Sequence, residues 1–541
     1  MLLNKNDNRN TSEIDIKITN NFVFCHHIGI LLFITYLTKI CKEVPFSLQW
    51  FVTVLIGAVN IEQTKLLDFE SINLIFRNFI KNLTLQRIQL SEIGTKENLK
   101  KLLQFNAQII GIENDTKFYY DPHTKRYTGM YKILKGWCGN LGKIAKILNI
   151  DFFHTTKGYP LYLEHDDNYY DMRERFLKQV ERLRETLNIP EEKNLTFIID
   201  RGIYKMELFN NLIGTKNHII TWEKDYEKGQ WRESNMTGNF TITKYRNSSK
   251  DLLTYNIKYT EQEWSKNSKI RQLIVYATNP KNVSIELSIL VTNPAIPAKD
   301  CITDMLNRWI QENDNKYLIT HFGIDYITSY DIFTYKEIKH ILIEKNIKSG
   351  ELKSLQNEKK NIEKELSKYL ISENQNKKSN KKIQQKINFL SNELKRIKSE
   401  IKNVYKTQSK IDYLIKQETI KLDTCKKITM DTIKIIARNI FYLSIKQFIK
   451  MYDNFRDDHV IFRNLSQSHG CIMLDKENVR VLLYPTIRYS PKIKQIIKEF
   501  LDIINSQNNV LPDNSNRKIT ISLLEENSIV FAIQNQLKLP F

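Results

Sequence analysis

The segment Leu195–Asp200 reads LTFIID, an apolar run that ends in a carboxylate. It does not alternate between apolar and polar residues, as a strand with one solvated face would. Such runs are typical of a central strand that is buried on both faces of a sheet. The segment therefore predicts the middle of an α/β domain, with Asp200 at the edge of the sheet.

The neighbouring segments extend this α/β pattern. Lys117–Asp121 (KFYYD) predicts a short aromatic strand that also ends in a carboxylate, and residues 150–154, 161–164 and 218–222 predict further strands. Residues 168–188 predict an amphipathic helix. The apolar residues of this helix that share one face are Met172, Phe176, Val180 and Leu183.

Residues 226–295 contain several β-type runs, which predict an antiparallel insert. Pro294 and Pro297 break the chain after it, and a helix is expected to begin near Ala298 and to continue through Tyr317. The regions on either side differ from this pattern. Residues 1–115 are predicted to be mostly helical, and residues 421–541 to be a mixed C-terminal domain.

Residues 345–420 carry 19 basic and nine acidic residues, a net charge of +10. Apolar residues recur there with unbroken 4-3 spacing, which is typical of a coiled coil. They are Ile383, Ile387, Leu390, Leu394, Ile397, Ile401 and Val404. An earlier arm carries apolar residues between 352 and 366, and residues 372–380 between the arms are polar. We predict an antiparallel coiled-coil hairpin with its tip near Asn376; a parallel coiled coil between subunits is the alternative.

The whole chain of 541 residues is basic, with 82 Lys and Arg against 61 Asp and Glu, a net charge of +21. This excess favours a polyanionic partner such as nucleic acid. The alternative is that richness in Lys, Asn and Ile reflects AT-rich codons. Six cysteines without a C-x-x-C pair exclude a disulfide scaffold and fit a reducing compartment.

Two uncharged stretches, residues 18–38 and 44–61, raise the question of membrane spans. Both contain polar residues, so we interpret them as buried helices of a soluble domain. No signal peptide is evident, and no P-loop, G-x-S-x-G or H-E-x-x-H motif is present. We therefore expect neither a nucleotide cofactor nor a zincin-type metal site.

Asp121, Asp200 and Glu312 are candidate metal ligands, because converging carboxylates suit hard divalent cations. Two such ions can activate the attacking oxygen and stabilise the leaving oxygen in phosphodiester displacement. Arg308 shares a helix face with Glu312, and Lys316 lies one turn later. The alternative is that the aspartates cap turns and that Arg308 and Glu312 form a solvated helix pair.

Three segments carry a resemblance to a known family: 118–129 (FYYDPHTKRYTG), 196–204 (with FIIDRGIY) and 308–330 (RWIQENDNKYLITHFGIDYITSY). They resemble the DDE transposases of bacterial insertion sequences, in the subgroup whose third motif reads RW-x-QEN-x-x-KY. The order of segments is similar as well: strands and the first Asp, a helix, a strand with the second Asp, a β-rich insert, and a helix with the Glu.

The resemblance implies an α/β RNase H-like core at residues 116–335, with the β-rich insert at about 226–295. It implies that Asp121, Asp200 and Glu312 hold two Mg²⁺ ions, for which Mn²⁺ is an alternative. It further implies that Arg308 and Lys316 contact DNA, and that Gln311 and Asn313 support the ligands. His123 is either a phosphate contact or a structural residue of the turn.

The sequence departs from the family at two places. Pro122 follows Asp121 where Gly is more common, and proline fixes φ and removes an N–H. Asp314 and Asn315 stand where aromatic residues are usual. Asp314 is expected to point away from the metals, at a cost to packing or to contacts with the DNA ends.

We therefore expect a transposase that cleaves phosphodiester bonds at the ends of an insertion sequence and joins them to target DNA. It would act on double-stranded DNA as a homodimer on paired ends, in the cytoplasm at the nucleoid. The alternatives are a catalytically inactive DNA-binding or coiled-coil scaffold protein, and a membrane-anchored protein that uses residues 18–61.

Two further groups of residues leave alternatives open. His26 and His27 are packing residues or metal ligands, and Trp222 and Trp231 are buried against the sheet or stack on an unpaired base.

Overall fold

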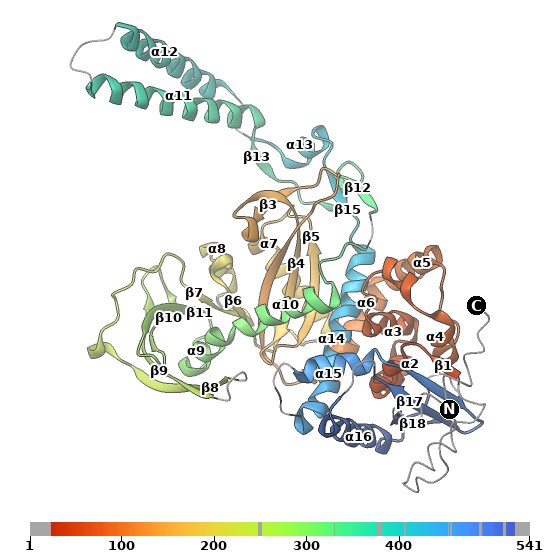
Figure 1. The fold of residues 1–541 in the computed structure, drawn as a ribbon. Coiled ribbons are helices and arrows are strands. Elements are labelled where there is room, and N and C mark those ends of the chain that lie inside the picture. Colours follow the sequence, from red (N-terminus) through yellow and green to blue (C-terminus); the bar gives the residue numbers. More distant parts are fainter. Residues whose placement is uncertain are drawn as a thin grey trace. The chain divides into compact units, whose positions relative to one another are not determined.

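The structure, a computed structural model, describes residues 23–246, 251–328, 330–375, 381–404, 407–452, 454, 457–485, 489–511 and 516–524. The chain divides into two compact units (Figure 1). Unit 1 contains residues 1–125, 148–329 and 424–541, and unit 2 contains residues 126–147 and 330–423. Both units are therefore assembled from segments that are far apart in the sequence.

The main sheet of unit 1 has β6 (Leu195–Ile199) near its centre, and all five residues of this strand are buried. β6 pairs in parallel with β2 (Lys117–Arg126) on one side and with β7 (Asn217–Trp222) on the other. β4 (Lys143–Thr155) lies next to β2 and pairs with the antiparallel β5 (Pro160–Asp166). The prediction of a buried central strand from LTFIID is confirmed.

The β-rich insert continues the same sheet. Its strands are β8 (Gly238–Arg246), β9 (Asp251–Trp264), β10 (Asn267–Thr278) and β11 (Ser284–Val291). Neighbouring strands are antiparallel, and β11 joins β7, also antiparallel. The predicted antiparallel insert is therefore confirmed, and it extends the edge of the sheet beyond β7.

Four helices follow or flank these strands. They are α7 (Met172–Leu187), α8 (Met206–Leu212), α9 (Ala298–Asn307) and α10 (Trp309–Phe322). α7 begins with a capping box in which the side chains of Asp171 and Glu174 satisfy free backbone N–H groups. The helix expected from Ala298 onward is interrupted at Arg308, which ends α9 and begins α10.

The N-terminal segment is mostly helical, as predicted. Its helices are α2 (Ile34–Glu43), α3 (Leu48–Ile56), α4 (Phe69–Phe76), α5 (Leu83–Ile93) and α6 (Lys96–Ile110). The C-terminal segment contributes α14 (Cys425–Met451), α15 (Asp457–Ser466) and α16 (Pro491–Ser506). Side chains from both segments and from the main sheet form one hydrophobic core.

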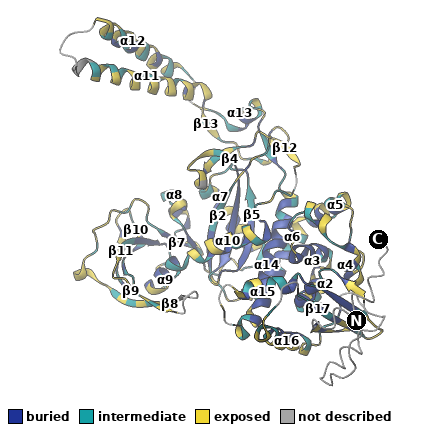
Figure 2. Ribbon diagram, viewed as in Figure 1, coloured by how far each residue is buried: buried dark blue, intermediate teal, exposed yellow. Residues whose placement is uncertain are grey.

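A second sheet joins the two ends of unit 1. β1 (Val23–Cys25) pairs with β16 (His469–Leu474), which pairs with β17 (Asn478–Tyr484) and through it with β18 (Lys518–Leu523). α14 crosses the core and is buried along most of its length (Figure 2). Within the described residues, no helix is long and apolar enough to span a membrane.

Unit 2 contains two long helices that pack against each other, α11 (Gly350–Gln375) and α12 (Lys381–Asn403). Ile387, Leu390 and Ile397 of α12 are buried, in agreement with the 4-3 pattern. The predicted tip at Asn376 lies outside the described residues.

The rest of unit 2 is built from short elements. The hairpin of β3 (Lys135–Cys138) with the start of β4 belongs to it, as do α13 (Lys410–Lys416) and two small two-stranded sheets. The sheets pair β12 (Ile332–Thr334) with β15 (Ile420–Leu422) and β13 (Asn346–Lys348) with β14 (Thr407–Ser409).

Candidate active site

Three elements of unit 1 carry the candidate carboxylates. Asp121 lies in β2, and Asp200 follows the last residue of the adjacent parallel strand β6. Because β2 and β6 run in the same direction, these two residues lie at the same edge of the sheet. Glu312 lies in the first turn of α10.

Arg308 contacts two of the three carboxylates. Its Nη2 lies 2.8 Å from Oε1 of Glu312 and 3.9 Å from Oδ2 of Asp200. The Arg308 side chain is only 17% exposed, whereas the side chains of Asp200 and Glu312 are 45% and 46% exposed. The guanidinium group is thus held between the end of β6 and the start of α10, and both carboxylates keep accessible oxygens.

Asp121 is the most buried member of the group. Burial raises the pKa of Asp121 to about 6; the positive charge of Arg308 opposes this rise, and the negative charge of Glu312 adds to it. Nδ2 of Asn315 donates a hydrogen bond to Oδ2 of Asp121 at 3.2 Å. Asp121 is therefore near the same group of charges and is oriented by α10.

Asn315 is a site residue that the sequence interpretation did not assign. Its position is a departure from the family motif, yet it contacts Asp121 from α10. The available signal was its spacing, because residues i and i+3 share a helix face and Asn315 follows Glu312 by three positions.

The chemistry of this group fits a hard divalent cation, because all three side chains offer carboxylate oxygens. In the described part of the chain, however, no three acidic, histidine or cysteine side chains lie close enough to hold one ion. A cation already lies between two of the carboxylates, since the Arg308 guanidinium contacts Asp200 and Glu312. The group thus attracts positive charge, and Arg308 provides it here.

The other predicted site residues have diverse surroundings. His123 lies in β2 and its Nε2 is 2.9 Å from Oδ1 of Asp325, a carboxylate that Lys125 also contacts. Lys316 and Asn313 are exposed on α10. Gln311 is fully buried, and neither polar atom of its amide has a hydrogen-bond partner among the described residues.

Asp314 does not weaken the packing, because it is paired within the core. It is buried, and its Oδ2 lies 3.1 Å from Nε2 of His154 while Oδ1 lies 2.5 Å from Nη2 of Arg438. His154 belongs to β4 and Arg438 to α14. Asp314 therefore connects α10 to the sheet and to α14.

A second buried group fixes the end of α10. Lys427 of α14 donates hydrogen bonds to the carbonyl oxygens of Ile324 and Tyr326, and Lys434 donates to that of Gly323. Both ammonium groups contact Asp431, at 2.7 and 3.2 Å. The carbonyl groups that follow α10 are thereby satisfied by side chains of α14.

Asp431 is wholly buried and also contacts Nε2 of His165 at 3.0 Å. Burial would raise the pKa of Asp431, but the two lysines more than offset it and hold that pKa well below its usual range. Burial lowers the pKa of Lys434 to about 8. The carbonyl partners of the two lysines lie about 100 residues away in the sequence, so no local pattern indicates them.

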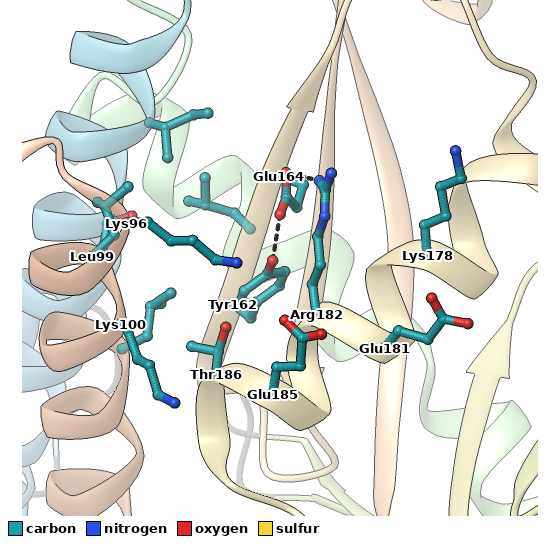
Figure 3. A pocket seen from close by; sticks show the side chains of 14 residues that line it. Lys96, Leu99, Lys100, Tyr162, Glu164, Lys178, Glu181, Arg182, Glu185 and Thr186 are labelled. Carbon is teal, nitrogen blue, oxygen red and sulfur yellow. Dashed lines mark hydrogen bonds and ion pairs between the residues drawn. The ribbon is translucent and has the colours of Figure 1, made fainter. Parts of the chain in front are cut away.

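One cavity of unit 1 lies away from the carboxylate group. It has a volume of about 590 Å³ and lies between α6, β5, α7 and α14. Its lining includes the basic residues Lys96, Lys100, Lys178 and Arg182 and the acidic residues Glu164, Glu181 and Glu185 (Figure 3). Glu164 accepts hydrogen bonds from Tyr162 and Arg182. The positive and negative charges that line this cavity are therefore largely balanced.

The remaining candidates are engaged with other rings of the protein. Nδ1 of His26 lies 3.2 Å from Nδ1 of His469, and the His27 ring lies near both. Trp231 stacks on Tyr276, with ring centroids 5.7 Å apart, and Trp222 packs against the core of the insert.

Comparison with known proteins gives one family match. A family model described as "Transposase protein" matches residues 178–524, which include Asp200, Arg308 and Glu312 but not Asp121. No curated protein matches the chain. Among solved structures, a piggyBac transposase synaptic complex with hairpin DNA matches 55% of this chain and 69% of its own at 10% identity, with a TM-score of 0.26. Because the family model covers well over half of the chain, the protein belongs to this transposase family.

Proposed function

We propose that the protein is a DDE-type DNA transposase that cleaves phosphodiester bonds at the ends of an insertion sequence and transfers the freed strand to target DNA. The observation that carries the proposal is the position of Arg308 between Asp200 and Glu312, with Asp121 on the adjacent strand of the same sheet edge. Membership of a transposase family supports the same reaction class.

The order of elements supports an RNase H-like core. β2 carries the first aspartate, α7 precedes β6 and the second aspartate, the insert follows, and α10 carries the glutamate. This is the order that the resemblance to DDE transposases implies. The subgroup of bacterial insertion sequences with an RW-x-QEN motif remains part of the proposal.

Asp121, Asp200 and Glu312 would hold two Mg²⁺ ions, or Mn²⁺ in their place. Such ions supply Lewis-acid activation of the attacking and leaving oxygens. Asn315 would orient Asp121, to which it donates a hydrogen bond, and Gln311 and Asn313 would support the ligands. Arg308, Lys316 and His123 would hold the DNA backbone, and Arg308 would leave the carboxylates to do so.

Double-stranded DNA is the proposed partner, both as element ends and as target, and the net charge of +21 supports this choice. We further propose a homodimer on paired ends, a cytoplasmic location at the nucleoid, and no nucleotide cofactor. The helices α11 and α12 would form a coiled-coil hairpin that clamps DNA or the second subunit; a solvated spacer is the alternative.

Substitution of Asp200 tests the proposal. The unmodified protein is expected to cleave duplexes that carry the inverted repeats flanking its reading frame, in the presence of Mg²⁺ or Mn²⁺ only. Asp200→Ala should abolish cleavage and retain DNA binding. Glu207→Gln is the matched control, because Glu207 is an exposed carboxylate of α8 whose ion pair is with Lys205.

The alternative is a non-catalytic DNA-binding or scaffold protein derived from such an element. The specific observation in its favour is that no three ligands lie together among the described residues. DNA binding without cleavage by the unmodified protein, with either metal ion, would support this alternative and contradict the enzyme.

A further inference from the structure

A second cavity is lined in part by Arg201, the residue that follows Asp200. It has a volume of about 400 Å³, in the lower part of the usual range of about 300–1,000 Å³ for ligand pockets. Its lining residues are Arg173, Arg201, Gly202, Tyr204, Lys224 and Asp225. Arg201 and Lys224 follow the carboxyl ends of β6 and β7, and Arg173 lies in the first turn of α7. The cavity therefore opens at the sheet edge that carries Asp200.

The positive charge of this cavity is only partly compensated. Arg201 and Lys224 are exposed, and neither side chain forms an ion pair with a residue that the structure describes. Arg173 is paired with Asp171, with Nε–Oδ1 and Nη2–Oδ2 distances of 2.5 and 2.8 Å. Asp225 is the one acidic residue of the lining. Two cations are thus available to a ligand, in contrast to the balanced charges of the larger cavity.

One wall of the cavity is rigid. The ring of Tyr204 packs edge-on against Phe209 and Trp264, with centroid distances of 5.5 and 5.9 Å. The Trp264 indole N–H in turn donates a hydrogen bond to Glu223, which directly precedes Lys224. The backbone segments that carry Arg201 and Lys224 are therefore held by the same buried aromatic group.

We propose that this cavity binds backbone phosphate groups of the DNA strand on one side of the scissile phosphate. The inference rests on the proposed function, which places the scissile phosphate at Asp200. Arg201 is the next residue, so its Cα lies about 3.8 Å from that of Asp200. Successive phosphates of one strand advance by about 3.4 Å along the duplex axis, so neighbouring phosphates come within reach of Arg201 and then Lys224.

DNA binding in EDTA tests this proposal without requiring cleavage. The probe is a fluorescein-labelled 30-base-pair duplex of arbitrary sequence, and its anisotropy is measured over a series of salt concentrations. Each lost phosphate contact reduces the slope of log K against log salt by about 0.9. The double variant Arg201→Gln/Lys224→Gln is therefore expected to lower the slope by about 1–2.

The matched control is Lys193→Gln/Lys216→Gln. These lysines precede β6 and β7, so the control removes the same charge from the opposite ends of the same two strands. It is expected to keep the slope and to change affinity by less than about threefold. Equal slopes for the two double variants would overturn the proposal, and so would a failure of the unmodified protein to bind DNA at low salt.

The two proposals fail in different ways. If the unmodified protein binds but never cleaves with Mg²⁺ or Mn²⁺, the enzymatic function is wrong while the salt slopes still decide the phosphate site. If it cleaves, a neutral methylphosphonate placed at single positions locates the contact. At the contacted position the methylphosphonate should weaken cleavage by the unmodified protein and leave cleavage by the Arg201→Gln/Lys224→Gln variant unchanged. If the methylphosphonate affects cleavage by both proteins equally at every position, the proposed phosphate site is wrong.

Discussion

The position of Arg308 predicts that this residue competes with metal ions for the carboxylates. Its guanidinium lies 2.8 Å from Glu312 and 3.9 Å from Asp200, so a divalent cation that binds there must displace it or remain close to it. Arg308→Gln removes the positive charge and keeps a side chain of similar reach. We therefore expect the variant to bind Mn²⁺ more tightly than the unmodified protein.

The expected gain in Mn²⁺ affinity can be calculated from Coulomb's law with the dielectric constant of water, since the side chains of Asp200 and Glu312 are about half exposed. At 4 Å two unit charges interact by about 1 kcal/mol in water, so a divalent ion and a guanidinium repel by about 2 kcal/mol. An energy of about 2 kcal/mol corresponds to a roughly 30-fold change in the dissociation constant. In 1 M salt, where the screening length is about 3 Å, the difference should become much smaller.

Isothermal titration calorimetry with MnCl₂ at about 0.1 M ionic strength measures this effect. Lys316→Gln is the control, because Lys316 is also a cation of α10 but is exposed and forms no ion pair with a described residue. The control should change the affinity by less than about threefold. If Arg308→Gln binds Mn²⁺ no more tightly than Lys316→Gln does, Arg308 does not compete for the site and the arrangement is an ordinary helix ion pair.

Three further predictions concern other parts of unit 1. Asp431→Asn leaves two buried ammonium groups without their carboxylate and should cost roughly 3–5 kcal/mol of stability; a loss below about 1 kcal/mol in chemical denaturation would contradict this. Burial lowers the pKa of His27 to about 4, so the unfolded chain binds a proton that the folded protein does not, and stability is lost as the pH falls from 6.5 toward 4. His27→Asn, which suits the left-handed backbone at this position, should make stability less dependent on pH. If the variant loses as much stability between pH 7 and 4 in chemical denaturation as the unmodified protein does, the prediction is wrong. Asn315→Ala removes the hydrogen bond to Asp121 and should weaken Mn²⁺ binding by roughly 10–100-fold. A calorimetric Mn²⁺ titration that gives the same affinity for this variant as for the unmodified protein would contradict the prediction.

Local patterns in the sequence predicted the elements that depend on local physics. The unbroken apolar run of LTFIID requires burial on both faces, and β6 is buried along its whole length. The β-type runs of residues 226–295 likewise predicted the antiparallel insert. The break between α9 and α10 was missed because helical residues continue on both sides of Arg308 and no proline or glycine marks it.

Long-range relations could not be predicted in the same way. The charges of Lys427 and Asp431 are evident in the sequence, but their partners after α10 are fixed only by the tertiary fold. The segment 126–147 lies within the predicted catalytic region, yet it forms a compact unit with residues 330–423. The residue types and positions of the three carboxylates and the resemblance point to them as candidates, whereas the contact of Asn315 with Asp121 is fixed only by the tertiary fold.

The anchoring of α10 by α14 has a consequence for synthesis of the chain. All three carboxylates are translated before α14, whose Lys427 caps a carbonyl group 103 residues upstream. A nascent or prematurely terminated chain that ends within α12 would contain every candidate ligand, but Asp314 would lack Arg438 and the end of α10 would lack its lysines. The contacts by which α14 holds α10 can therefore form only after the ribosome has passed α14, and a chain that stops earlier lacks all of them.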